Sequence, residues 1–230
     1  MSYLVDKVST ELDQRVKLRG AGARQWLVID FADSVLKLPS TGVTKLSLLE
    51  GDNLDQLINP ATAQFDIAVI NLQLAWLDYA TVFTALGKIL LPGGKLFFAT
   101  FGPDTLFELR QAWSRHDRYP HVHDFTDLHL LGDQLVRSGF RRPILDADWL
   151  GVEFEDIDLL MEDLRLEGFH NISAGRRRTL TGRNRLNAVR HFFPVDAGPA
   201  QITFEIVYGF AETAETGGAG IRVNPPQAGQ

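Results

Sequence analysis

Six arginines fall within one stretch, residues 168–194, which reads GFHNISAGRRRTLTGRNRLNAVRHFFP and contains no aspartate or glutamate. The whole chain carries a formal net charge of −6, so this stretch is a local positive patch on an acidic protein. The planar guanidinium group of arginine binds carboxylates and phosphates through paired hydrogen bonds. The pattern therefore predicts a site for an acidic ligand or partner. The alternative is a solvated arginine-rich surface without a ligand.

Two histidines, His121 and His123, lie close to Asp124 and Asp127. Histidine and aspartate are common metal ligands, but this spacing lacks a third ligand in a fixed context, as known zinc motifs have. The chain contains no cysteine, which excludes disulfide bonds and thiolate metal sites. We therefore predict no metal site.

Polar side chains also stand at the ends of apolar runs that are typical of buried strands. Asp30 lies near the end of the run WLVIDF. Asn71 lies within the next strong apolar run, residues 65–74, and Trp76 follows that run. In an open α/β sheet, ligands bind beyond the carboxyl ends of the strands. Asp52 follows a weaker strand candidate at 43–49. In dinucleotide-binding sites, an acidic residue after a strand binds the ribose hydroxyls. The alternatives are an exposed loop carboxylate for Asp52, a turn residue for Asn71 and a core anchor for Trp76.

The elements that carry these residues alternate between strands and helices. Residues 3–18 have the apolar spacing of an amphipathic first helix. The run from Phe65 to Leu74 predicts a strand buried on both faces, Asp78 can cap the helix that follows, and residues 95–100 form the next strand. A strand, a helix and a second strand of this kind indicate a right-handed crossover in a parallel sheet.

The second half of the chain contains further helices and a different kind of strand. A helix is expected at 105–115, where Thr105 and Glu108 form the pattern of a capping box. Residues 155–194 are expected to form a helical insertion. Residues 202–208 alternate Ile, Phe, Ile and Tyr with Thr, Glu and Val, which is typical of a half-buried strand of antiparallel type.

Several motifs resemble one known family. A strand beginning Phe-Asp, then a helix, then Leu-x-Pro-Gly-Gly and an apolar strand resembles the second half of the class I S-adenosylmethionine-dependent methyltransferases. The motifs NLQLAW, FGPDTL, YPHVHDF, GFHN and GRRRTLTG narrow the resemblance to the malonyl-acyl-carrier-protein O-methyltransferases of biotin synthesis. The resemblance covers residues 65–210.

This resemblance implies an α/β fold with a mostly parallel, Rossmann-like methyltransferase sheet and an antiparallel last strand. It also implies S-adenosylmethionine as the cofactor and an acyl carrier protein, which is acidic, as the partner. The candidate cofactor-binding residues are Asp30, Asp52, Asn71 and Trp76. The candidate substrate-binding residues are His170, Asn171, Arg176, Arg177 and Arg178. No residue is assigned a catalytic role, because a carboxylate substrate is already ionised near pH 7.

The loop after the first strand departs from the family pattern. Glycines in this loop let the backbone approach the cofactor, but Asp30 is followed by Phe-Ala-Asp-Ser, without a glycine. The N-terminal part is also too short for the usual number of strands and helices. We therefore expect weak or absent cofactor binding and little or no catalysis, as in a pseudoenzyme. The alternative is a scaffold or regulatory subunit that pairs with an active homologue.

Length and composition suit one globular unit. The 230 residues are expected to form a single domain over 1–212 and a flexible tail over 213–230. No apolar stretch approaches the ~20 residues of a membrane helix, and the N-terminus lacks a signal-peptide pattern. We therefore expect a cytoplasmic protein. The negative net charge argues against nucleic acid as a partner, while a homodimer or heterodimer stays open.

Overall fold

The computed structural model describes residues 2–30, 36–37, 39, 41–47, 64–179, 181–194 and 198–215. Its strands are β1 (Trp26–Ile29), β2 (Val43–Leu46), β3 (Phe65–Asn71), β4 (Leu90–Phe101), β5 (Phe140–Phe154) and β6 (Ala200–Thr213). Its helices are α1 (Ser2–Arg19), the 3-10 turn η2 (Gln73–Trp76), α2 (Tyr79–Ile89), α3 (Phe107–Ser114), α4 (Leu128–Arg137), α5 (Ile157–Leu166) and α6 (Arg183–Phe192).

The strands form one sheet in the order β2-β1-β3-β4-β6-β5. The pairs β1–β2, β1–β3 and β3–β4 are parallel, whereas β6 is antiparallel to both β4 and β5. The predicted fold class is therefore confirmed. Because β2 lies on one side of β1 and β3 on the other, the direction of winding reverses between β1 and β3.

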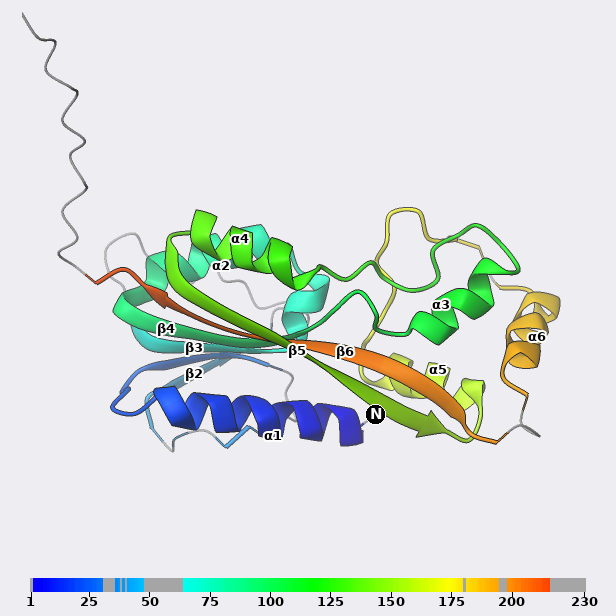
Figure 1. Cartoon of the computed structure of the whole chain (residues 1–230), viewed down its shortest axis with the longest axis horizontal. Coiled ribbons are helices and arrows are strands. Elements are labelled where there is room, and N and C mark those ends of the chain that lie inside the picture. Colours follow the sequence, from blue (N-terminus) through cyan, green and yellow to red (C-terminus); the bar gives the residue numbers. More distant parts are fainter. Residues whose placement is uncertain are drawn as a thin grey trace, which may run out of the picture.

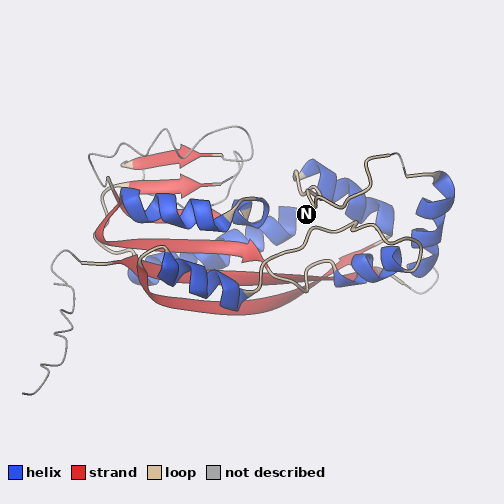
Figure 2. Ribbon diagram, turned by 90° about the horizontal axis from the view of Figure 1, so that it is seen from above, coloured by secondary structure: helices blue, strands red, loops and turns tan. Residues whose placement is uncertain are grey.

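Helices cover both faces of the sheet. Figure 1 shows α2 and α4 on one face and α1 on the other. The long strands β5 and β6 reach past their neighbours, and α3, α5 and α6 gather around their far end (Figures 1 and 2). The two helices α5 and α6 lie between β5 and β6 in the chain, which confirms the predicted helical insertion.

The apolar spacing of the sequence explains how each face is closed. Leu4, Val8, Leu12 and Val16 recur every fourth residue of α1, and all four are buried in one core with residues of β3 and β4. A second core lies on the other face, where Phe83 of α2 packs with residues of β3, β4 and α4. Both faces of β1 and β3 are covered, so their side chains are buried almost without alternation.

The start of α2 agrees with its predicted cap, but the start of α3 does not. Asp78 caps α2, since its side chain accepts a hydrogen bond from the Thr81 amide at 3.2 Å. The predicted capping box at Thr105 and Glu108 is wrong. Glu108 instead accepts hydrogen bonds from the amide and hydroxyl of Thr203 in β6, at 2.9 and 2.6 Å. A neighbouring strand therefore offers these side chains better partners than the helix end does.

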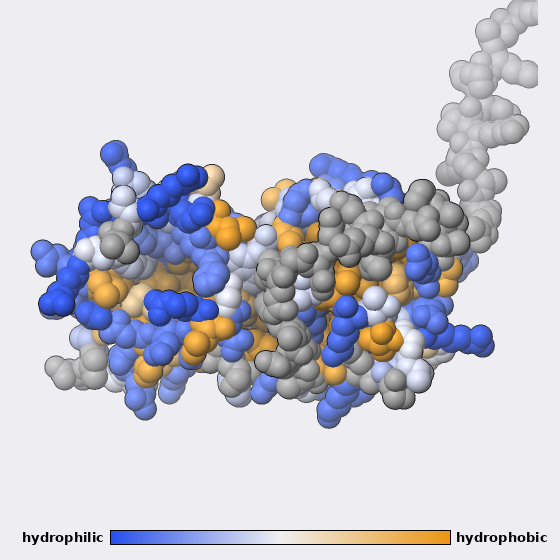
Figure 3. All heavy atoms as spheres, turned by 180° about the vertical axis from the view of Figure 1, so that it is seen from behind, coloured by the Kyte–Doolittle hydropathy of each residue, from blue (hydrophilic) through white to orange (hydrophobic). Residues whose placement is uncertain are grey.

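Three further expectations concern the C-terminal tail, the domain boundaries and membrane-spanning helices. Strand β6 continues to Thr213, and most of the predicted tail, residues 216–230, lies outside the described residues. The single-domain boundaries stay a prediction. No described helix has both the length and the apolar character that crossing a membrane requires. On the face that Figure 3 shows, hydrophobic residues form small patches between hydrophilic ones.

Candidate functional site

Two predicted site residues meet at the point where the winding of the sheet reverses. Ile29 of β1 pairs with Ile70 of β3, so Asp30 and Asn71 lie side by side at the carboxyl ends of these strands. The Asn71 amide nitrogen donates to Asp30 Oδ1 at 3.2 Å and to Ser9 Oγ of α1 at 2.8 Å. Asp30 is 4% exposed and Asn71 is fully buried.

The Asp30–Asn71 pair is suited to a cationic donor. Asn71 Oδ1 is buried and has no hydrogen-bond partner among the described residues. A carboxylate and an amide oxygen at one edge accept hydrogen bonds and favour positive charge. Asp52, the fourth predicted cofactor-binding residue, lies outside the described residues. The segment 31–35, which contains the glycine-free loop, does so as well.

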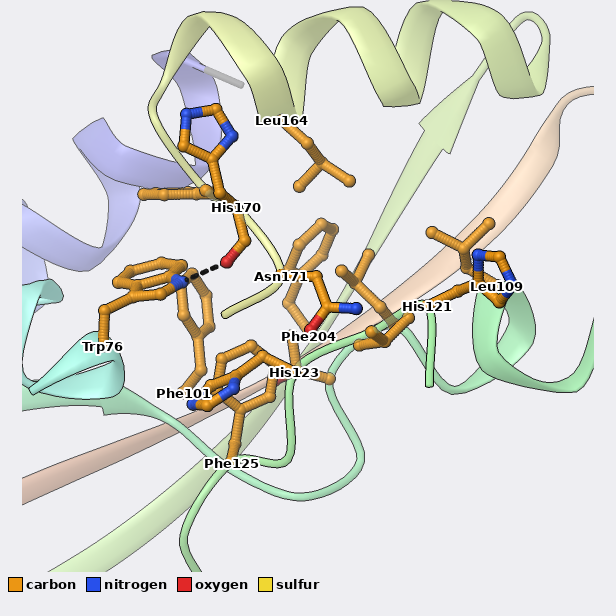
Figure 4. Close-up of a pocket in the computed structure, with 14 residues that line it drawn as sticks. Trp76, Phe101, Leu109, His121, His123, Phe125, Leu164, His170, Asn171 and Phe204 are labelled. Carbon is orange, nitrogen blue, oxygen red and sulfur yellow. Dashed lines mark hydrogen bonds between the residues drawn. The ribbon is translucent and has the colours of Figure 1, made fainter. Parts of the chain in front are cut away.

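An aromatic pocket lies at the same edge of the sheet, beyond η2 and β4 (Figure 4). Its volume is about 50 Å³. It is lined by the apolar residues Phe101, Leu106, Leu109, Val122, Phe125, Leu164, Phe169 and Phe204. It is also lined by six residues with polar groups, which are Trp76, Thr105, His121, His123, His170 and Asn171. The structure thus brings three predicted site residues, Trp76, His170 and Asn171, into one pocket.

Trp76 organises the aromatic wall of this pocket. Its ring stacks on Phe169 with centroids 4.7 Å apart and meets Phe101 and Phe125 edge-on at 5.7 and 6.2 Å. These are favourable arrangements for aromatic pairs. The Trp76 indole N–H also donates to the His170 carbonyl at 2.8 Å. Trp76 therefore fastens the loop after α5 to η2, the turn that follows β3.

The turn after β4 is held in place by a buried carboxylate. Glu205 of β6 is 5% exposed and accepts a hydrogen bond from the Asp104 amide at 2.7 Å. A Cβ atom on Gly102 would lie 2.3 Å from Glu205 Cδ, so only glycine fits there. Burial raises the pKa of Glu205, although the Asp104 amide opposes that shift. The motif FGPDTL therefore serves to place Phe101 at the pocket.

His121 enters the pocket wall through a stacked and hydrogen-bonded arrangement. Its ring lies on Trp113 with centroids 3.8 Å apart, and its Nε2 is 2.9 Å from Asp117 Oδ1. Burial disfavours the charge on Asp117, but the Tyr119 amide, His121 and Arg185 outweigh it and hold the pKa of Asp117 below its usual value. His121 thus already has a carboxylate partner.

His123 lies on the Trp76 side of the pocket, whereas His121 lies on the opposite side (Figure 4). Its ring meets Phe125 edge-on at 5.4 Å. Burial lowers the pKa of His123 below 6.5, although Asp124 and a hydrogen bond to the Ala75 carbonyl act against this. The Nδ1 atom is buried and has no hydrogen-bond partner among the described residues.

The three consecutive arginines lie outside this pocket. Arg176 donates to two carbonyls of its own loop at 3.3 and 3.2 Å, and Arg177 donates to the Thr179 hydroxyl at 2.6 Å. Arg178 is exposed. No arginine is among the pocket's lining residues in the described part of the chain.

Other arginines of the same stretch have acidic partners from elsewhere in the chain. Arg190 of α6 binds Asp158 of α5 through two hydrogen bonds, at 2.8 and 3.1 Å. Arg185 lies 3.8 Å from Asp117. These two arginines fix α6 in the fold, so the positive patch is smaller than the sequence indicates.

Sequence reasoning missed most of the pocket wall. Phe101, Phe125 and Phe169 were not singled out as site residues, and His123 was considered only as a metal ligand. Phe101 and Phe125 each lie in a motif that carried the family resemblance, FGPDTL and YPHVHDF. The flanking phenylalanines of these motifs were the signal that could have located the pocket.

Comparison with solved structures places the fold in a class. A protein from Bacillus halodurans, described as a candidate methyltransferase, superposes with a TM-score of 0.56 at 10% identity over 90% of this chain and 99% of its own. The YcgJ protein of Bacillus subtilis gives the same TM-score and identity over the same shares of the two chains. The chain therefore has the Rossmann-like methyltransferase fold. No family model matches it.

Sequence comparison with curated proteins is more specific. Malonyl-[acyl-carrier protein] O-methyltransferase of Nitrosospira multiformis is 42% identical over 144 residues, 61% of this chain and 47% of that protein. A protein of the same name in Coxiella burnetii is 31% identical over 192 residues, 82% of this chain and 65% of that protein. The chain is thus homologous to malonyl-[acyl-carrier protein] O-methyltransferases, as its motifs predicted. The first of these matches spans about half the relative's length.

Proposed function

We propose that this chain is a methyltransferase-like protein of the malonyl-carrier O-methyltransferase type. It binds S-adenosylmethionine at the edge of the sheet marked by Asp30 and Asn71. Its aromatic pocket accommodates the acyl group that a carrier protein bears. The proposal rests on the meeting of these two residues at the reversal point of the sheet, where α/β proteins bind ligands. The homologues' names support the choice of substrate and of methyl transfer as the reaction.

The residues present fit this cofactor. S-adenosylmethionine carries an α-ammonium group, a donor of three hydrogen bonds, and Asn71 Oδ1 is a buried acceptor without a partner among the described residues. Asp30 supplies a carboxylate beside it. When bound, the cofactor supplies an electrophilic methyl group on its sulfonium centre.

The chain's own part in methyl transfer is to bind, orient and exclude water. A carboxylate is ionised near pH 7, so no general base is needed. The rings of Trp76, Phe101, Phe125 and Phe169 form an apolar enclosure that keeps water from the reacting groups. Because no glycine follows Asp30, we expect cofactor affinity weaker than the micromolar range and little turnover.

Calorimetric titration with S-adenosylmethionine tests the cofactor site. We expect weak binding to the wild type and a further loss of about tenfold in D30N, because the ammonium group loses a charged acceptor. The matched control is D66N, at the opposite end of β3, where Asp66 accepts hydrogen bonds from the amides of Arg24 and Gln25. Equal affinities of D30N and wild type would refute this site.

A scaffold or regulatory subunit that pairs with an active homologue is the second candidate. The glycine-free stretch after Asp30 favours it. A wild-type protein that gives no heat with S-adenosylmethionine at millimolar concentration, yet forms a complex with an active homologue, would establish this alternative.

We also propose that Arg176, Arg177 and Arg178 meet an acidic carrier protein outside the pocket. Replacing all three by alanine should weaken carrier binding and reduce its dependence on salt, since exposed charge pairs are screened. A control that removes the same charge elsewhere is the triple alanine variant at Arg137, Arg141 and Arg142. Carrier binding that is unchanged in the first variant would leave these arginines as a solvated surface.

A further inference from the structure

A carboxylate that enters the aromatic pocket meets few free polar groups. The Thr105 hydroxyl is occupied on both sides by the backbone of Glu205, at 3.0 and 3.1 Å. The Asn171 amide donates to the Pro120 carbonyl at 2.7 Å and accepts from the Ser173 amide at 3.0 Å. Both side chains are therefore already held by partners within the fold, although the Asn171 NH2 group has a second N–H.

The remaining polar groups of the pocket differ in whether they already have a hydrogen-bond partner. The Trp76 indole donates to the His170 carbonyl, and His121 is paired with Asp117. His170 is an exposed residue. His123 alone among these lining residues has a buried ring nitrogen, Nδ1, that lacks a hydrogen-bond partner in the described part of the chain.

We propose that His123 binds the free carboxylate of the acyl substrate and takes up a proton as it does so. This inference rests on the proposed function, because it assumes an acyl group that ends in a carboxylate. It assigns carboxylate recognition inside the pocket to a histidine, while the arginines of the insertion stay outside it.

The proton uptake follows from the surroundings of His123. A neutral imidazole has one N–H and one nitrogen with a lone pair, and burial favours this neutral ring in the free protein. A lone pair at Nδ1 would repel a carboxylate, whereas the protonated ring carries an N–H on both nitrogens. When the ring gains a proton from solvent, Nδ1, which has no partner among the described residues, can donate to the carboxylate, and the resulting ion pair is charge-assisted.

The charges around His123 agree with a neutral ring in the free protein. Arg110 of α3 disfavours the protonated form and Asp124 favours it, while burial disfavours it most. The ring also meets Phe125 of the aromatic wall edge-on. An incoming carboxylate would add the negative charge that tips this balance.

The size and position of the pocket suit a short carboxylate group. A volume of about 50 Å³ corresponds to roughly four water-sized groups, similar to the four heavy atoms of a carboxymethyl tip. His123 lies on the Trp76 side of the pocket, and η2, which carries Trp76, follows the end of β3 at Asn71. One carboxylate oxygen can bond His123 and leave the other as the nucleophile.

Calorimetry with malonyl-N-acetylcysteamine in two buffers of different ionisation enthalpy tests the proposal at about pH 7.5, above the ordinary histidine pKa. We expect uptake of about one proton per bound probe in the wild type and none with acetyl-N-acetylcysteamine, which lacks the carboxylate. H123Q keeps a side chain that can donate a hydrogen bond but cannot become charged. It should bind the malonyl probe about tenfold more weakly, without proton uptake.

The control is H129Q, a histidine of α4 outside the pocket lining, which should behave as wild type. Malonyl binding without proton uptake, or equal binding by H123Q, would overturn the role of His123 and leave the proposed function intact. Failure of the wild type to bind either probe would overturn both. If H123Q does not fold, the wild-type difference between the two probes still decides the question.

Discussion

Replacing Trp76 by phenylalanine should loosen the loop after α5 without unfolding the protein. The substitution removes one hydrogen bond, from the indole N–H to the His170 carbonyl at 2.8 Å. A phenylalanine ring can still stack on Phe169, so most of the aromatic contact is retained. The loss of one neutral hydrogen bond costs about 0.5–1.5 kcal/mol.

Trypsin can report this loosening, because Arg176, Arg177 and Arg178 lie in the same loop. When the loop opens and closes faster than cleavage, the cleavage rate follows the population of the open form. We therefore expect first cleavage at these arginines to be about 2- to 12-fold faster in W76F than in wild type.

Trp149 offers a matched control at a different place in the fold. Its indole N–H donates to Asp104 Oδ2 at 3.1 Å, so W149F removes the same kind of bond from β5. Loop cleavage in W149F should equal that of wild type. An unchanged rate in W76F, or the same acceleration in both variants, would refute the idea that Trp76 fastens the loop.

Three further predictions concern the sheet and the helix α2 that connects β3 to β4. G209A should lower the free energy of unfolding by about 1–3 kcal/mol in urea denaturation, because its Cβ would lie 2.1 Å from Cζ of the buried Phe98. In wild type, burial raises the pKa of Glu205 above its ordinary 4.5, so the native state holds this proton more tightly than the unfolded chain. This contribution to stability is lost as pH rises through the folded pKa, and E205Q should therefore gain stability relative to wild type between about pH 4.5 and pH 7; a constant difference across that range would contradict the assignment. D78A should cost about 0.5–2 kcal/mol in the same assay, since Asp78 caps α2 through Thr81.

The sequence by itself determined the layers of the fold. The apolar run at β3, the helix capped by Asp78 and the run at β4 are local patterns, and each encodes one element through its own period. The alternation in β6 predicted a half-buried antiparallel strand; the direction is confirmed, but the half-burial is wrong, because β6 lies between β4 and β5 and is buried throughout residues 204–211. The rule that ligands bind beyond strand ends selected Asp30 and Asn71 as candidates, and the structure places the two side by side.

Tertiary structure decided the partners of individual side chains. The motif at Thr105 and Glu108 has the spacing of a capping box, yet both side chains bond β6, about a hundred residues away in the chain. Arg190 lies in a stretch without acids but finds Asp158 on a neighbouring helix. Local spacing cannot encode such pairs, because they depend on which elements pack together.

The pocket shows the same division between residues that the sequence predicted and contacts that the tertiary structure decided. Trp76 and His170 were both selected from the sequence, but their hydrogen bond joins residues 94 positions apart. The free nitrogen of His123 is a property of its surroundings, since only the packed structure shows which neighbours leave Nδ1 without a partner. Residue types could thus be predicted from sequence motifs, whereas the capacity of each group to bind a ligand was set by what the fold had already placed beside it.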